Sequence, residues 1–469
     1  MRFDGGYLGR LLRVATAYKA KVLCSGVFVS GRSPGSLLDA DLAVDGLLPL
    51  RSLNSTIDAK QRTVTVSCLG QFKSTALYRS GLGSTLVLDS TVAELQAQAA
   101  DFGAWAEARP RLEQDLPVAT VMPAGIDAAA LAAVVEGAFV EDNPRRLKRS
   151  RAVVIVHRGQ IIAERYADGF SVHTPMLGWS LAKSVVNALI GVLVHQGRLA
   201  LDAKDLLPAW RQLGDARREI TLDQLLRMSS GLSFSENYAS PLSDVTTMLF
   251  QRGDGAAYVA QRPLDALPGE AFCYASGTTV LLCRIIREVV CGAFADSLTD
   301  YFAFPRRALF DRLGMASAVL EPDAAGTFTG SSFMYATARD WAKLGLLYLW
   351  DGCWQGERIL PAGWVAYSSA PNNAPHKTTR EPADFYGAHF WRGVPNSFMA
   401  SAVAGTEGRA DWPQGAYLAS GYQGQFVTVL PQQDLVVVRL GLSQRRNSWD
   451  HHGFIVRVAA AVTGAQPKA

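Results

Sequence analysis

The fold class that the sequence predicts is α+β, with a predominantly antiparallel sheet flanked by helices. Two predicted hairpins near opposite ends of the chain favour this class over alternating β-α-β units. The first joins the β-rich runs Ala152–His157 and Ile161–Tyr166 across Arg-Gly-Gln, and the second joins Gln425–Leu430 and Leu435–Leu440 across Pro-Gln-Gln-Asp. Of 469 residues, 49% are hydrophobic and 19% are charged, so the chain can bury a large core.

Helices are predicted between and after these hairpins. Ser180 to Gly197 is an apolar stretch of helical character, and the sequence from about 185 to 300 is mostly helical with breaks at Gly, Ser and Pro. We expect residues 185–300 to form a mostly helical subdomain on one side of a cleft. Residues 454–462 are expected to form a closing helix, with His451 and His452 as a solvated turn before it.

Residues 1–115 differ in sequence pattern from the rest of the chain and are predicted to be an N-terminal extension of unknown role. The strand-like runs Thr63–Cys68 and Ser74–Tyr78 predict a β-hairpin in it. Three prolines between Pro110 and Pro123 indicate a connector, so residues 116–469 are expected to form the second domain. Docking to a membrane or to a partner protein is one open possibility for residues 1–115.

Composition excludes several classes of function. The formal charge is +4 without a basic block, so we expect no nucleic-acid partner. No apolar run approaches the eighteen or so residues of a membrane-spanning helix, so no transmembrane segment is predicted. The short apolar run Val22–Val29 is a poor signal peptide, so the chain is expected in the cytoplasm as written, or in the periplasm if its start is truncated.

The six cysteines form no C-x-x-C pair and no Cys/His cluster with zinc spacing, so no metal site is expected. Cys24 and Cys68 leave two alternatives open, a disulfide or buried free thiols.

One serine motif is rejected on chemical grounds. Gly31–Gly35 matches the nucleophile-elbow pattern G-x-S-x-G, with Ser33 as its serine. That elbow needs the backbone N–H of the residue after the serine, and Pro34 has none. We therefore expect a turn here.

The stronger candidate is Ser180 with Lys183, an S-x-x-K pair at the start of the apolar helix. Residues three apart lie on one helix face, and the helix N-terminus favours a developing negative charge. Desolvation would lower the pKa of Lys183, so its neutral amine could take a proton from Ser180.

Two downstream motifs accompany this pair. Tyr274, followed two residues later by Ser276, can bring a phenol and a hydroxyl to one serine. Ser420–Gln425 contains Gly421, Tyr422 and Gly424 and leads into the second hairpin, where a backbone N–H could stabilise an oxyanion.

The order S-x-x-K, Y-x-S and glycine-rich strand resembles the serine β-lactamase and penicillin-binding-protein superfamily. Within it, residues 120–465 are similar to the class C β-lactamase-related hydrolases that include 6-aminohexanoate-dimer hydrolase and carboxylesterases. The resemblance implies a β-lactamase/D,D-peptidase-like fold and a serine hydrolase that needs no cofactor. Its substrate would be a small amide or ester, and the sequence does not predict the oligomeric state.

The resemblance also implies roles for individual residues. Ser180 would be the acyl-accepting nucleophile, with Lys183 and Tyr274 as proton-transfer groups in an order that stays open. The backbone N–H groups of Ser180 and Gln425 would form the oxyanion hole. Tyr238, Ser276, Tyr422 and Gly424 would contact substrate.

Two departures from the family pattern narrow the expected activity. Ser276 stands where class C β-lactamases carry Asn, and Tyr422 stands where they carry Lys or, in esterase-like relatives, often His. A cation that would hold a β-lactam carboxylate is therefore missing at that place. An amidase or esterase is favoured; a β-lactamase or D,D-peptidase and a non-catalytic binding or assembly protein of the same fold are the alternatives.

Overall fold

The largest sheet combines strands from the middle and the end of the chain. A computed structural model describes residues 6–43, 48–108, 115–292, 298–379, 383–394, 411–443, 445 and 448–463. The sheet has five antiparallel strands in the order β12-β13-β14-β5-β6. Their bounds are β5 (Ser150–His157), β6 (Gln160–Tyr166), β12 (Tyr417–Gly421), β13 (Gln425–Leu430) and β14 (Leu435–Gly441). Both predicted hairpins lie in this sheet, and the predicted α+β class is confirmed.

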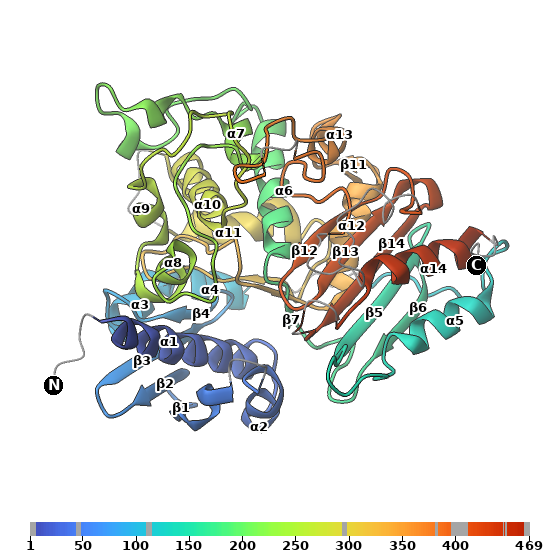
Figure 1. Cartoon of the computed structure of the whole chain (residues 1–469), viewed down its shortest axis with the longest axis horizontal. Coiled ribbons are helices and arrows are strands. Elements are labelled where there is room, and N and C mark those ends of the chain that lie inside the picture. Colours follow the sequence, from blue (N-terminus) through green and yellow to red (C-terminus); the bar gives the residue numbers. More distant parts are fainter. Residues whose placement is uncertain are drawn as a thin grey trace.

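Helices cover both faces of this sheet because its apolar residues alternate between them. Val153 and Ile155 of β5 face α5 (Ala128–Gly137) and α14 (His451–Thr463), which lie in front of the sheet in Figure 1. Val154 and Val156 belong to the core on the opposite face, with α6 (Leu181–His195) and α12 (Ala338–Leu349).

A mostly helical part lies beside the sheet, and α6 stands between the two (Figure 1). The helices of this part are α7 (Leu222–Leu226), α8 (Asp244–Gln251), α9 (Gly255–Ala260), α10 (Ser276–Cys291) and α11 (Thr299–Pro305). A short sheet β7-β9-β8 joins this part to the segment before α6. Its strands are β7 (Met176–Leu177), β8 (Val319–Leu320) and β9 (Met334–Ala336). The chain after α12 forms β10 (Cys353–Trp354), β11 (Glu357–Arg358) and α13 (Trp364–Ser369).

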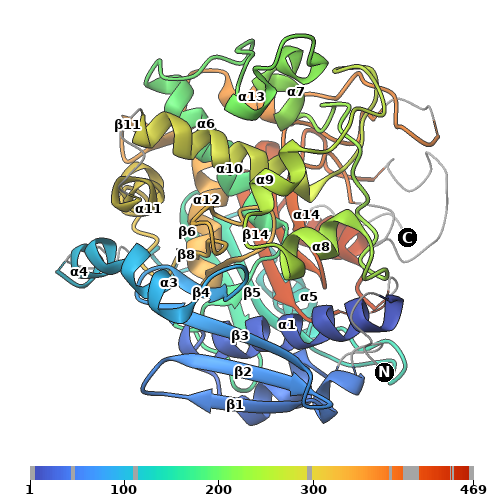
Figure 2. The ribbon, with the colours of Figure 1, turned by 90° about the vertical axis from the view of Figure 1, so that its left-hand side faces the viewer.

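The described residues between 6 and 108 form an N-terminal layer built on a four-stranded antiparallel sheet. Its elements are α1 (Tyr7–Phe28), α2 (Pro34–Ser36), β1 (Asn54–Asp58), β2 (Thr63–Cys68), β3 (Phe72–Arg79), β4 (Gly83–Leu86), α3 (Val92–Gln98) and α4 (Ala100–Ala108). Small buried residues of α1, such as Ala17 and Ala20, allow the helix to lie close over Val64 and Val66 of β2. Figure 2 shows α1 between this sheet and α8.

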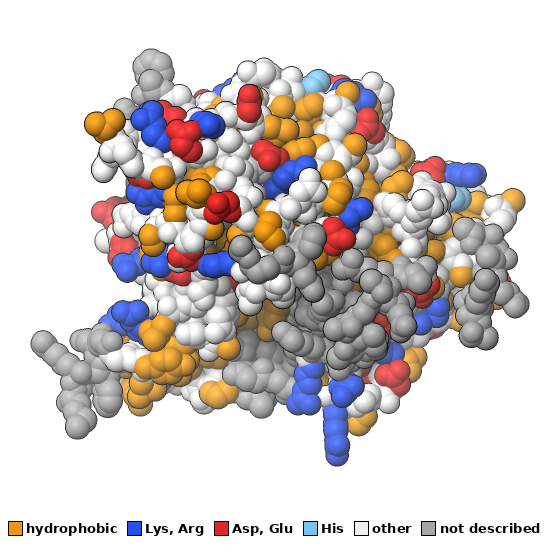
Figure 3. All heavy atoms as spheres, turned by 45° about the horizontal axis from the view of Figure 1, so that its top comes forward, with side chains coloured by type: hydrophobic (Ala, Val, Ile, Leu, Met, Phe, Trp, Pro, Cys, Tyr) orange, Lys and Arg blue, Asp and Glu red, His pale blue; other side chains and the backbone are white. Residues whose placement is uncertain are grey.

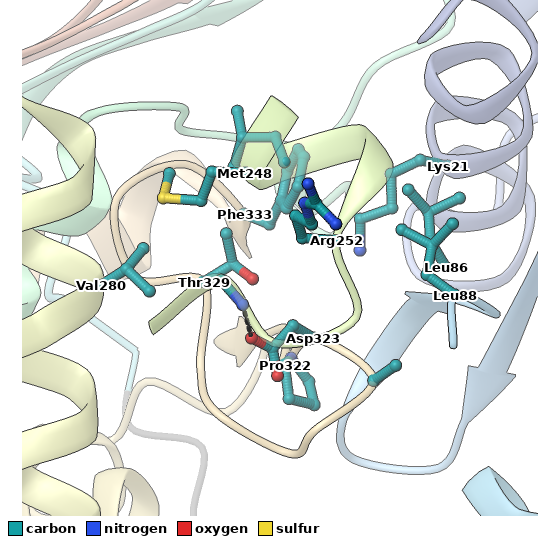
Figure 4. A pocket seen from close by; sticks show the side chains of 13 residues that line it. Lys21, Leu86, Leu88, Met248, Arg252, Val280, Pro322, Asp323, Thr329 and Phe333 are labelled. Carbon is teal, nitrogen blue, oxygen red and sulfur yellow. Dashed lines mark hydrogen bonds between the residues drawn. The ribbon is translucent and has the colours of Figure 1, made fainter. Parts of the chain in front are cut away.

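A buried ion pair joins the N-terminal layer to the rest of the chain. Lys21 of α1 lies 2.6 Å from Glu321, whose side chain is fully buried. Glu321 also accepts hydrogen bonds from Ser25 Oγ at 2.8 Å and from the backbone N–H of Ser84 at 2.7 Å. The Lys21 side chain borders a cavity of about 20 Å³ and lies over the Phe333 ring (Figure 4). This space is large enough for about one water molecule.

The structure bears on three expectations from the sequence. Cys24 and Cys68 are free thiols, and Cys24 is buried. The solvated turn predicted at His451 is wrong, because that side chain is fully buried, stacks on Phe426 and hydrogen-bonds Thr428. Within the described part of the chain, no helix is long and apolar enough to cross a membrane.

Candidate active site

Ser180 lies immediately before α6, where the chain makes a sharp turn. Trp179 has a φ of +49°, a conformation that is uncommon for a residue with a side chain. Ser180 has helical dihedral angles at the N-cap position, and its side chain makes no capping hydrogen bond. Its hydroxyl is therefore available to other side chains. Among the described residues, no backbone acceptor takes the Ser180 N–H.

Lys183 lies one turn into α6 and is almost completely buried. Its Nζ is 3.0 Å from Ser180 Oγ, 3.1 Å from Ser276 Oγ and 2.8 Å from the Ser331 carbonyl oxygen. Burial lowers the pKa of Lys183 to about 8, and the negative charge of Glu236 opposes that shift. A substantial fraction of this amine is therefore neutral near physiological pH.

Tyr274 contributes a phenol from the segment that leads into α10. Its ring centroid is 4.9 Å from Lys183 Nζ, and Tyr386 and Trp391 pack around the ring. Burial raises the pKa of Tyr274, the charge of Glu236 raises it further, and a hydrogen bond with Ser180 lowers it. The net effect keeps this phenol protonated, as a proton donor must be.

The carboxylate of Glu236, which the sequence analysis did not select, lies next to Ser276. Glu236 accepts hydrogen bonds from Ser276 Oγ at 2.5 Å, from the Ser276 backbone N–H at 2.8 Å and from Tyr238 Oη at 2.9 Å. Ser276 is fully buried and also contacts Lys183. No local pattern could have found Glu236, because its contact with Ser276 spans 40 residues of sequence.

The end of β12 and the start of β13 form the opposite wall of the site. A Cβ at Gly421 would collide with the carbonyl oxygen of Gly178, so glycine lets this strand approach the turn before Ser180. Gln423 accepts a hydrogen bond from Trp179 Nε1 at 3.2 Å, and Gln425 is held through its side-chain amide by Gly441.

Gly424 lies in the β12–β13 turn with a φ of +82°. Its carbonyl oxygen accepts a hydrogen bond from the buried Arg439 at 2.7 Å. This glycine therefore shapes the turn, and its contacts are with the protein interior.

Two tyrosines stand at the mouth of the site. Tyr238 and Tyr422 are each about half exposed, and their rings are nearly parallel, with centroids 6.3 Å apart. Tyr422 also meets Trp179 edge to face at 5.7 Å. The half-exposed side chains beside Ser276 and Trp179 are therefore aromatic, and neither carries a positive charge.

The structure brings most of the predicted site residues together. Ser180, Lys183, Tyr274, Ser276 and Tyr238 form one connected cluster of contacts. Tyr422 joins it through ring stacking.

Among the described residues, no group of three or more His, Cys, Asp or Glu side chains could hold a metal ion. On the face shown in Figure 3, acidic and basic side chains are intermixed.

Comparisons with known proteins show what this chain is similar to. The family model described as Beta-lactamase matches residues 139–458. The 6-aminohexanoate-dimer hydrolase of Paenarthrobacter ureafaciens is 25% identical over 318 residues, which cover 65% of this chain and 75% of that protein.

Two solved structures show a shared fold. A penicillin-binding-protein homologue from Caulobacter crescentus is 19% identical with a TM-score of 0.52, covering 74% of this chain and 99% of that one. A family VIII carboxylesterase is 16% identical with a TM-score of 0.52, covering 74% of this chain and 98% of that one. They confirm the predicted fold, and the roles of individual residues stay predictions.

Proposed function

The chain belongs to the β-lactamase family, and on this premise we propose that it is a serine hydrolase that forms an acyl-enzyme on Ser180. Its substrates would be small amides or esters. The observation that carries the proposal is the contact of 3.0 Å between Ser180 Oγ and a buried lysine whose pKa burial lowers to about 8. A lysine that is mostly neutral just above this pH can act as a base toward a hydroxyl.

Acylation would begin with proton transfer from Ser180 Oγ to Lys183 Nζ. The oxygen then attacks the carbonyl carbon of the substrate, and the backbone N–H groups of Ser180 and Gln425 would stabilise the resulting oxyanion. The position of Ser180 at the start of α6 adds the positive end of a helix dipole.

Collapse of the tetrahedral intermediate requires a proton for the leaving group. Tyr274 is the proposed donor, because its phenol is protonated and contacts Ser180. The proton that Lys183 took from Ser180 would then restore the phenol, so that both groups return to their starting states. A water molecule would then attack the ester carbonyl, with the same groups acting in reverse, and Ser180 would regain its proton.

The aromatic entrance favours an amide or ester over a β-lactam. Tyr422 offers no positive charge to a carboxylate, and it stacks on Tyr238 instead. We therefore expect slow turnover of nitrocefin beside faster hydrolysis of short p-nitrophenyl esters. Faster turnover of nitrocefin than of these esters would favour the alternative of a β-lactamase.

Intact-mass measurement after exposure to a fluorophosphonate tests the nucleophile. Wild type should gain one adduct, Ser180→Ala should gain none, and its ester hydrolysis should fall about a thousandfold or more. Ser33→Ala is the matched control, because Ser33 is exposed and belongs to the rejected G-x-S-x-G motif. An adduct that persists in Ser180→Ala would identify another serine, and folded wild type without any adduct would favour a non-catalytic protein.

A further inference from the structure

Glu236 touches the candidate catalytic groups only through Ser276 and Tyr238. We infer that Glu236 is a positioning residue that acts through the Ser276 hydroxyl to direct the amine lone pair of Lys183 at Ser180. The inference rests on the proposed function, because it assumes that Lys183 takes the proton of Ser180. It adds a residue that lies outside the S-x-x-K and Y-x-S motifs.

The hydrogen bonds of Glu236 determine whether the Ser276 hydroxyl donates to Lys183 or accepts from it. Glu236 accepts three hydrogen bonds and donates none, which is the pattern of an ionised carboxylate. A serine hydroxyl has a single proton, and the contact of 2.5 Å commits that proton to Glu236. Ser276 Oγ can then only accept a hydrogen bond from Lys183 Nζ, 3.1 Å away.

The same reasoning orients the amine of Lys183. Three oxygens surround its Nζ, those of Ser180, Ser276 and the Ser331 carbonyl. The Ser331 carbonyl can only accept, and the Ser276 hydroxyl is made an acceptor by Glu236. A neutral amine has two N–H bonds and one lone pair, so both N–H bonds are used by these two oxygens. The lone pair is left facing Ser180 Oγ, as proton abstraction requires.

This arrangement also accounts for the departure from Asn at position 276. The amide oxygen of an asparagine is always an acceptor, whereas a serine hydroxyl can either donate or accept. A serine at this place needs a second group that takes its proton. Glu236, hydrogen-bonded to both the hydroxyl and the backbone N–H of Ser276, supplies that group.

The charge of Glu236 has a separate effect on Lys183. Burial lowers the pKa of Lys183, and the Glu236 carboxylate raises it. The other titratable groups nearby are the phenols of Tyr274, Tyr238 and Tyr386, each with a raised pKa, and His389, whose pKa burial lowers to about 3. At neutral pH these four side chains are uncharged. Substitution of Glu236 by a neutral residue would therefore remove the negative charge that raises the pKa of Lys183.

The test compares two variants, which separate the effect of the direction of the Ser276 hydrogen bond from the effect of the Glu236 charge. Glu236→Gln removes the charge, and its amide can donate to Ser276 Oγ, which frees the serine proton to bond the Lys183 lone pair. Ser276→Ala removes the acceptor and keeps the charge. We expect each to lower the plateau rate of fluorophosphonate labelling about tenfold to a hundredfold. The acid limb of the pH profile should move to lower pH in Glu236→Gln and stay in place in Ser276→Ala.

A double-variant cycle completes the experiment. Because Glu236 acts through Ser276, the combined variant should have the plateau rate of Ser276→Ala alone. Glu270→Gln is the matched control, since this exposed glutamate lies in the segment before Ser276, on a different loop from Glu236, and should leave both rate and profile unchanged. Tyr238→Phe tests whether the effect passes through the other partner of Glu236, because a double cycle of Glu236→Gln with Tyr238→Phe should be additive, whereas non-additivity there would overturn the route through Ser276.

The outcomes distinguish this inference from the proposed function. Additive effects in the cycle, or a Glu236→Gln variant that labels like wild type, would overturn the inference while leaving the nucleophile in place. Absence of labelling on wild type would overturn the proposed function first. If Glu236→Gln does not fold, Ser276→Ala alone decides, because an undiminished rate in it would exclude Ser276 as the intermediary.

Discussion

Lys183 is the residue whose charge state should control the rate. Its amine must be neutral to accept a proton, and burial places its pKa at about 8. Below that pH the rate of ester hydrolysis should fall about tenfold per unit, and above it the rate should level off. Burial raises the pKa of Tyr274, so the phenol stays protonated across the plateau.

The measurement is kcat/KM for a p-nitrophenyl ester between about pH 6 and 9.5. Lys204→Arg, a change at an exposed lysine that pairs with Glu219, serves as the control and should leave the profile unchanged. A profile without an acid limb in this range would contradict Lys183 as the base.

At the residue scale, the sequence predicted the groups whose chemistry shows in local spacing. Ser180 and Lys183 are one helical turn apart, and Tyr274 precedes Ser276 by two residues. Glu236 escaped prediction because its importance depends on a contact between a loop and the first residue of α10, 40 positions further along the chain. The buried position of Lys183 could be inferred from its apolar neighbours, whereas its carbonyl partner Ser331 is 148 residues away.

At the element scale, α1 is a long helix that the sequence did not predict. Its apolar run is short, and Lys19 and Lys21 interrupt the hydrophobic pattern. Both lysines are nevertheless buried, since the Lys19 amine donates to the Leu53 carbonyl oxygen and Lys21 pairs with Glu321. Their partners lie elsewhere in the chain, so the local pattern could not predict that these positions are buried.

α1 also reaches the turn that precedes Ser180. The Tyr18 ring is nearly parallel to Trp179, with centroids 6.4 Å apart, and meets Phe250 edge to face. Trp179 holds a left-handed backbone conformation directly before Ser180, and such a conformation depends on the packing around it.

Tyr18→Ala should therefore weaken both stability and catalysis. We expect a loss of about 3 kcal/mol in the free energy of unfolding, because a large aromatic side chain leaves a cavity. The fluorophosphonate labelling rate of the folded fraction should fall about tenfold as the turn loses its support. Tyr18→Phe keeps the ring and should restore both quantities.

Tyr7→Ala is the matched control on the same helix, because that tyrosine is 56% exposed and should change neither quantity. A Tyr18→Ala variant that loses stability but labels at the wild-type rate would show that α1 does not support the turn.

At the scale of the whole molecule, the N-terminal layer lies outside the residues matched by the family model and yet shares a core with them. The division at residue 115 stays a prediction, as does the role of residues 1–115. The packing does predict that removing the layer would expose the apolar core that it shares with the rest of the chain to water and would unfold the chain.

Lys21→Met tests this junction without deleting any residues. The substitution leaves the Glu321 carboxylate buried beside only Ser25 and the Ser84 N–H, and should cost about 3–5 kcal/mol of unfolding free energy in urea denaturation. Adding Glu321→Gln removes the charge and should recover much of the loss. Lys60→Met, at an exposed position, is the control. A Lys21→Met variant with the unfolding free energy of wild type would mean that the ion pair does not stabilise the contact between the N-terminal layer and the rest of the chain.

The pairing of β14 with β5 has a consequence for the protein during its synthesis. Val156 lies opposite Val436, so about 280 residues separate partners that are neighbours in the sheet. At about 5–20 residues per second, a ribosome needs roughly 15–60 seconds to supply the second strand after the first. During that interval β5 presents an unpaired, apolar edge, and the nascent chain has to be protected from aggregation until its last strands emerge.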